Sequence, residues 1–137
     1  MSQAWNEIQL FLRRHLSPGV MWIFLINIAL FILYMLLTPF SKSLQVLFFL
    51  LMQTPKLTIE SFFIWQPVTY MFMHADLLHL LFNMIILWFF ASRLEDRWGT
   101  KRFLRFYFIV GIGAAFFHIM PSYLTGHQSA TMLGASG

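Results

Sequence analysis

Three polar residues in a strongly apolar chain have the types and spacing for acyl-transfer chemistry. His79 and Asn83 are four residues apart, so they share one face of a helix. Ser136 stands in the run Gly134-Ala135-Ser136-Gly137, at the expected start of another helix, where unpaired backbone N–H groups favour an anion. A serine, a histidine, an asparagine and such N–H groups in one cavity are the parts of an acyl-transfer site.

Each of these residues also has a structural interpretation. A histidine–asparagine pair can join helices through hydrogen bonds, and small residues around a serine allow close helix packing. A zinc site is disfavoured, because the four histidines expected on one side of the membrane contain no close ligand pair and Asp76 is the only carboxylate near them. These histidines are His74, His79, His118 and His127.

The composition indicates that these residues are held inside a membrane. Hydrophobic residues make up 59% of the 137 residues and charged residues only 10%, whereas soluble domains contain about 25% charged residues. So few charges cannot cover a surface in water, which excludes a soluble enzyme, a nucleic-acid-binding module and a disordered tail. The chain has no cysteine, which excludes disulfides and thiolate chemistry.

Three apolar stretches, at residues 20–37, 77–92 and 103–120, are long enough or nearly long enough to cross a bilayer. A fourth begins near Thr131. The connection 38–76 is too apolar to be a free loop, so we expect it to lie partly in the outer leaflet. The sequence therefore predicts an all-α, polytopic membrane bundle.

The basic residues predict the orientation of this bundle. Seven of the nine lysines and arginines lie before the first stretch, between the second and third, or, for Arg105, near the start of the third. The positive-inside rule therefore places residues 1–19 and the 93–102 connection in the cytoplasm, and residues 20–137 form the membrane domain. His79 and Ser136 then lie at similar depths, in the first turns of two inward-running helices that start at the outer face.

The order of the motifs resembles the rhomboid family of intramembrane serine proteases. The resemblance covers about residues 65–137 and includes Trp65 in the segment that precedes the histidines. Its motifs are His74-x4-His79-x3-Asn83, Glu95-x3-Gly99 and Gly134-Ala135-Ser136-Gly137. One departure is Gln66, which follows Trp65 where the family usually has arginine.

The resemblance implies a protease that cleaves transmembrane protein substrates within the lipid bilayer, without a cofactor or a metal. Ser136 would be the nucleophile. His79 and Asn83, with the backbone N–H of Ser136, would hold the oxyanion. His74 would be structural, and Glu95 would stabilise the cytoplasmic end of the second span.

The family's general base is a histidine on a helix well after the serine, and no such histidine is present among these residues. We therefore expect a rhomboid-like bundle truncated at the start of the fourth transmembrane helix, which is inactive by itself. One alternative is a non-catalytic rhomboid-like module that binds membrane proteins. Another is a channel or transporter whose histidines relay protons, although the stretch 103–120 has no continuous polar face.

Overall fold

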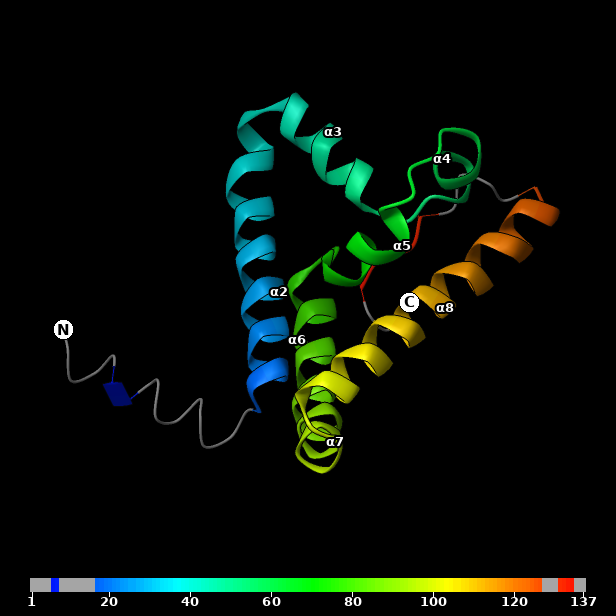
Figure 1. Cartoon of the computed structure of the whole chain (residues 1–137). Helices are drawn as coiled ribbons and strands as arrows, with labels where there is room; N and C mark the ends of the chain where they lie inside the picture. Colours follow the sequence, from blue (N-terminus) through cyan, green and yellow to red (C-terminus); the bar gives the residue numbers. More distant parts are fainter. Residues whose placement is uncertain (1–5, 8–16, 127–130, 135–137) are drawn as a thin grey trace.

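The computed structural model describes residues 6–7, 17–126 and 131–134, which form an all-α bundle (Figure 1). Two of the polar residues singled out in the sequence, His127 and Ser136, lie outside the described residues. The elements in chain order are α2 (Pro18–Leu37), η1 (Thr38–Phe40), α3 (Lys42–Leu51), α4 (Pro55–Glu60), α5 (Gln66–Thr69), η2 (Tyr70–Phe72), α6 (Leu77–Ile86), η3 (Leu87–Ala91), α7 (Ser92–Trp98) and α8 (Thr100–Leu124).

Three of the described helical stretches are long and apolar enough to cross a membrane, which confirms the predicted spans. They are Pro18–Phe40, Leu77–Trp98 and Thr100–Leu124. The second continues six residues past the predicted end at residue 92. The sequence-based boundary was placed before Arg93, but long basic side chains at a helix end can extend from the apolar region toward water. The helix therefore continues through α7.

The second span is not a uniform α-helix. Its middle part, η3, is a π-helical turn between α6 and α7, and Figure 1 shows the three elements following one another as a single column. A π-helical turn accommodates an extra residue within an α-helix. The axis of the span therefore keeps its direction, while the side chains of α7 are rotated about this axis relative to those of α6.

The connection between the first two spans is folded, as its apolar composition predicted. Ser41 caps α3, because its side-chain oxygen accepts a hydrogen bond of 3.4 Å from the N–H of Leu44. Further along, α4, α5 and η2 pack near α8 (Figure 1). A buried cluster joins this connection to α8 and consists of Tyr70, Met71, Ala115 and Met132.

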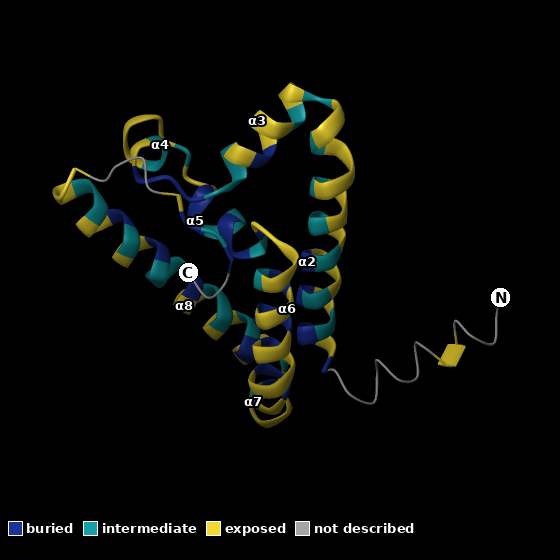
Figure 2. Cartoon of the chain, turned by 180° about the vertical axis from the view of Figure 1, so that it is seen from behind, coloured by how far each residue is buried: buried dark blue, intermediate teal, exposed yellow. Residues whose placement is uncertain are grey.

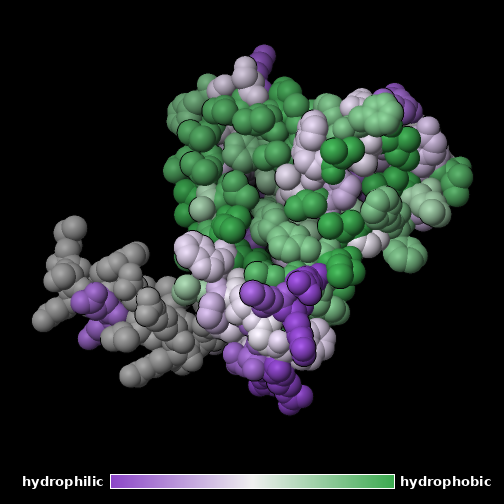
Figure 3. Space-filling model, in the orientation of Figure 1, coloured by the Kyte–Doolittle hydropathy of each residue, from purple (hydrophilic) through white to green (hydrophobic). Residues whose placement is uncertain are grey.

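The main core lies where α2, the second span and the start of α8 meet. Its buried members are Val20, Ile23, Leu80, Met84, Leu87, Ala91 and Phe103. The opposite helix faces are exposed (Figure 2), and the visible surface is mostly hydrophobic (Figure 3). Phe82 and Phe117 are 62% and 83% exposed. Such faces are expected where lipid replaces water as the solvent.

A single carboxylate joins the three spans at the end of the bundle where α7 meets α8. Glu95 is only 2% exposed. Its oxygens accept hydrogen bonds from the hydroxyl groups of Ser17 and Thr100, both at 2.6 Å, and from the backbone N–H groups of Gly19 and Val20 at 2.7 and 2.8 Å. Glu95 thus satisfies N–H groups that the first turn of α2 leaves without a helical partner.

Removing this carboxylate is expected to destabilise the bundle strongly. Glu95→Ala leaves several buried donors unpaired and should lower the free energy of unfolding by about 3–5 kcal/mol. Glu95→Gln, which keeps one acceptor oxygen, should lower it by less. Unfolding in mixed detergent micelles measures both changes. Asp96→Asn is the control, because Asp96 is adjacent and exposed; equal effects at the two positions would contradict this interpretation.

Candidate active site

His79 and Asn83 lie on α6, and the start of this helix is fixed by Asp76. The Asp76 carboxylate accepts a hydrogen bond of 2.8 Å from the backbone N–H of His79, which is the geometry of an N-cap. The cap places His79 in the first turn, where it is half-buried, and Asn83 in the next turn, where it is buried. The cap at Asp76 therefore determines how far along α6 the side chains of His79 and Asn83 lie.

Both side chains meet the backbone of Gly134. A Cβ atom at Gly134 would lie 2.7 Å from Asn83 Nδ2 and 2.7 Å from His79 Nε2, so no side chain fits there. The φ angle of Gly134 is +73°, a conformation that glycine adopts without steric cost. The structure thus brings the predicted pair together with the start of the Gly134–Gly137 run. Ala135, Ser136 and Gly137 lie outside the described residues.

Backbone hydrogen bonds hold residues 132–134 in this position. Gln53 and Met132 form an isolated antiparallel bridge, with N–H to O distances of 3.1 and 2.9 Å. The N–H of Gly134 donates to the carbonyl oxygen of Tyr70 at 2.9 Å. Tyr70 is fully buried and its hydroxyl donates to the carbonyl oxygen of Gly111 on α8 at 2.6 Å. The segment is therefore fixed to the connection between the first two spans and, through Tyr70, to α8.

His74 orients Asn83 from outside α6. Asn83 Nδ2 lies 2.9 Å from His74 Nε2, and the rings of His74 and His79 meet edge to face with centroids 5.1 Å apart. Burial, followed by the nearby charge of His79, lowers the pKa of His74 to about 4. His74 is therefore neutral at pH 7, and its Nε2 is suited to accept a hydrogen bond from the asparagine amide. This contact supports the structural role that the resemblance implied.

Gln66 organises the connection that holds this segment. It is fully buried, and its side-chain oxygen accepts from the N–H of Thr54 at 3.2 Å and from the hydroxyl of Thr58 at 2.8 Å. Its side-chain nitrogen donates to the carbonyl oxygen of Leu50 at 3.2 Å. An amide has both donors and acceptors. Gln66 therefore cross-links the connection at the position where the family usually has arginine.

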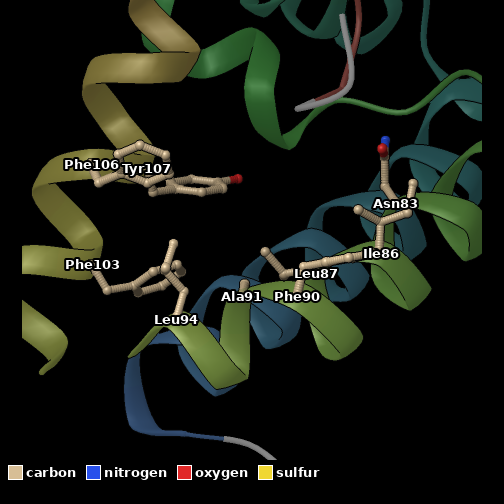
Figure 4. A pocket seen from close by; sticks show the side chains of 9 residues that line it. All are labelled: Asn83, Ile86, Leu87, Phe90, Ala91, Leu94, Phe103, Phe106 and Tyr107. Atoms are coloured by element: carbon tan, nitrogen blue, oxygen red, sulfur yellow. The ribbon is translucent and has the colours of Figure 1, made fainter. Parts of the chain in front are cut away.

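An apolar groove of about 390 Å³ begins at Asn83 and lies between the second span and α8 (Figure 4). Asn83 is the one amide in its lining. The other lining residues are Ile86, Leu87, Phe90, Ala91, Leu94, Phe103, Phe106 and Tyr107. In Figure 4 the side chains from the two helices face one another across this space. Among the residues that the structure describes, no group of three histidines or carboxylates is placed to hold a metal ion.

Sequence reasoning missed three residues that position the site. Gln53 and Tyr70 hold residues 132–134 through their backbone groups, and Tyr70 also contacts α8 through its hydroxyl. Backbone pairing between distant segments leaves no local signal in one sequence. Gln66 was singled out only as a departure from the family pattern. Its polarity within an apolar segment is the signal that could have identified it, because buried amides are normally hydrogen-bonded.

The fold and the site define a polytopic, all-α membrane protein with a histidine–asparagine pair against a glycine backbone at one end of the bundle. The Rhomboid domain family profile matches residues 61–137. The chain belongs to the rhomboid family.

Curated relatives are named as proteases of this family. The chain is 35% identical over 101 residues to "Rhomboid-like protease 3" of Toxoplasma gondii, an alignment that covers 69% of the chain and 38% of the relative. It is 44% and 42% identical over 41 residues to "Rhomboid protease GlpG" of Yersinia enterocolitica and Yersinia pestis, covering 30% of the chain and 15% of each relative. The chain thus matches well under half of each relative's length. No solved structure matches the chain significantly.

The low pKa of His74 predicts a loss of stability in mild acid. Between pH 6.5 and about 4 the unfolded state binds a proton at His74 that the folded state does not. The free energy of unfolding should therefore fall as the pH decreases through this interval, by at most about 2 kcal/mol once screening by solvent is included. Equilibrium unfolding at several pH values measures the slope, and His74→Gln should reduce it. An identical slope in the variant would contradict the assignment.

Proposed function

We propose that this chain is part of an intramembrane serine protease in which Ser136 is the nucleophile. One observation carries the proposal: the backbone of Gly134 lies against the side chains of His79 and Asn83, with no room for a Cβ atom. The names of the relatives as rhomboid proteases support the same class of reaction. The reaction is hydrolysis of a peptide bond in a transmembrane protein.

The short length of chain between Gly134 and Ser136 supports the proposal that Ser136 lies at the same site as His79 and Asn83. Consecutive Cα atoms are about 3.8 Å apart, so two residues span at most about 7 Å. Gly134 is itself held by its hydrogen bond to Tyr70 and by the neighbouring bridge at Met132. A position for Ser136 close to the histidine–asparagine pair is therefore part of this proposal.

His79 and Asn83 are suited to hold the oxyanion that forms when Ser136 attacks the carbonyl. An asparagine amide has two N–H donors, and a contact with His74 uses one of them. The second is then available to the developing charge. With the His79 ring and the backbone N–H of Ser136, it supplies hydrogen-bond donors at the oxyanion in a medium of low polarity, where each donor counts most.

We assign the general base to a histidine outside these 137 residues. His74 is a poor base, because its pKa is lowered to about 4 and its Nε2 faces the Asn83 amide. In the proposed reaction the base takes the serine proton and returns it to the leaving amine, and water then releases the acyl group by the same route. The 137-residue chain alone is therefore expected not to turn over substrate.

The groove between the second span and α8 suits the helix that would follow Ser136. Gly134 lies against Asn83, and Asn83 is at one end of the groove. A fourth span that starts at Ser136 and runs parallel to the second span would place apolar side chains against the groove. This arrangement would bury the lining residues and hold the nucleophile in the first turn of a helix.

The substrates that fit this site are transmembrane segments that unwind easily. A continuous helix hides its carbonyl groups in its own hydrogen bonds, so a helix-breaking segment exposes the scissile bond at lower cost. The distribution of arginine and lysine favours a cytoplasmic N-terminus and an active site toward the outer face.

A fluorophosphonate probe tests the nucleophile in the longer protein that contains this chain. Ser136→Ala should abolish labelling and cleavage of a transmembrane substrate, whereas Ser61→Ala, at an exposed serine, should change neither. Asn83→Ala should lower the cleavage rate by about a hundredfold through the loss of one oxyanion donor, and His79→Ala should keep some labelling. Labelling that persists in Ser136→Ala would refute the assignment.

Two glycines with similar positive φ angles test the close approach. Gly134→Ala places a methyl group against His79 and Asn83, so labelling of Ser136 should fall about a hundredfold or more, the loss that a displaced catalytic group produces. Gly126→Ala is the matched control, because its φ is +80° and its added Cβ meets no atom within 4 Å. Equal losses in the two variants would mean that backbone strain alone, and not contact with the pair, is responsible.

A further inference from the structure

Five exposed basic side chains surround the junction of α7 and α8, which we call the basic corner: Arg93, Arg97, Lys101, Arg102 and Arg105. They lie at the end of the bundle opposite the start of α6. Figure 3 shows the hydrophilic surface of the folded bundle concentrated there, below a mostly hydrophobic body.

The charges of the basic corner are not neutralised by the bundle. None of the five side chains makes a hydrogen bond or an ion pair with another described residue. Of the two nearby acids, Glu95 is buried and its oxygens accept from four donors inside the bundle. Asp96 is exposed and is the one carboxylate on the surface of the corner. A strong positive excess therefore remains on this surface.

The basic corner lies at the shared end of two membrane spans. The second span ends at Trp98 and the third begins at Thr100. Trp98 and Phe106 are 42% and 44% exposed, and their rings meet edge to face with centroids 5.3 Å apart. Exposed tryptophan beside the end of a span is typical of the membrane–water interface. The anions concentrated in that plane are the phosphates of lipids.

We propose that the basic corner binds anionic phospholipid headgroups, such as phosphatidylglycerol, in the leaflet that borders the α7–α8 junction. Arginine and lysine supply the hydrogen-bond donors for the phosphate. Trp98 and Phe106 contact the part of the acyl chains next to the headgroup. This binding does not depend on the proposed protease activity. It would stabilise the same junction that Glu95 holds from inside.

Native mass spectrometry of the chain in neutral detergent tests the proposal. Added dioleoyl-phosphatidylglycerol should bind more tightly than dioleoyl-phosphatidylcholine. Each cation at a membrane surface contributes about fivefold to such binding, so the double variant Arg97→Gln/Arg102→Gln should weaken it about 25-fold. The double variant Arg93→Gln/Lys101→Gln should weaken binding to a similar extent. It tests the same prediction if the first double variant does not fold.

The matched control removes two exposed cations from elsewhere on the bundle. Lys42 is the first residue of α3 and Lys56 lies in α4, both far in sequence from the basic corner. Lys42→Gln/Lys56→Gln should leave the affinity for phosphatidylglycerol unchanged. Equal affinity for the two lipids, equal weakening in the control, or displacement of the lipid by inorganic phosphate would each overturn the proposal.

Discussion

In a bilayer, backbone N–H and C=O groups have no water to bind, so each must find a partner within the protein. This constraint explains the hydrogen bonds that several polar side chains of the chain make. Glu95 satisfies the first N–H groups of α2, and Asp76 does the same for α6. Gln66 serves the irregular connection between the first two spans. Of these residues, Glu95 holds the end of the bundle away from the site, whereas Asp76 and Gln66 also position the site.

The elements of the fold could be predicted from the sequence because hydropathy is a local property. The three spans follow from their apolar runs, and the folded nature of the connection follows from residues such as Phe48 and Phe49. The end of the second span was placed too early, at residue 92, because the basic side chains beyond it suggested a loop. Local composition does not distinguish a loop from a helix whose charged residues extend out of the apolar layer.

The partners of the site residues could not be predicted in the same way. The spacing of His79 and Asn83 indicated a shared face, and the contact with Gly134 agrees with it. The bridge between Gln53 and Met132 joins segments almost 80 residues apart, and a backbone hydrogen bond imposes no particular side chain at either end. The contact of His74 with Asn83 likewise depends on how the chain turns before α6. The family resemblance singled out His79, Asn83 and Gly134, and the fold shows which hydrogen bonds and contacts hold these residues in place.

The π-helical turn at Leu87–Ala91 sets the angular phase of the second span. Each residue of an α-helix advances about 100° around the axis. Asn83 and Glu95 are twelve positions apart, so an unbroken α-helix would point them about 120° away from each other. If the turn absorbs one residue, the difference shrinks to about 20°. One surplus residue thus lets Asn83 and Glu95 lie on the same side of the second span. Deleting one residue of the π-helical turn would turn one of these two side chains toward the lipid.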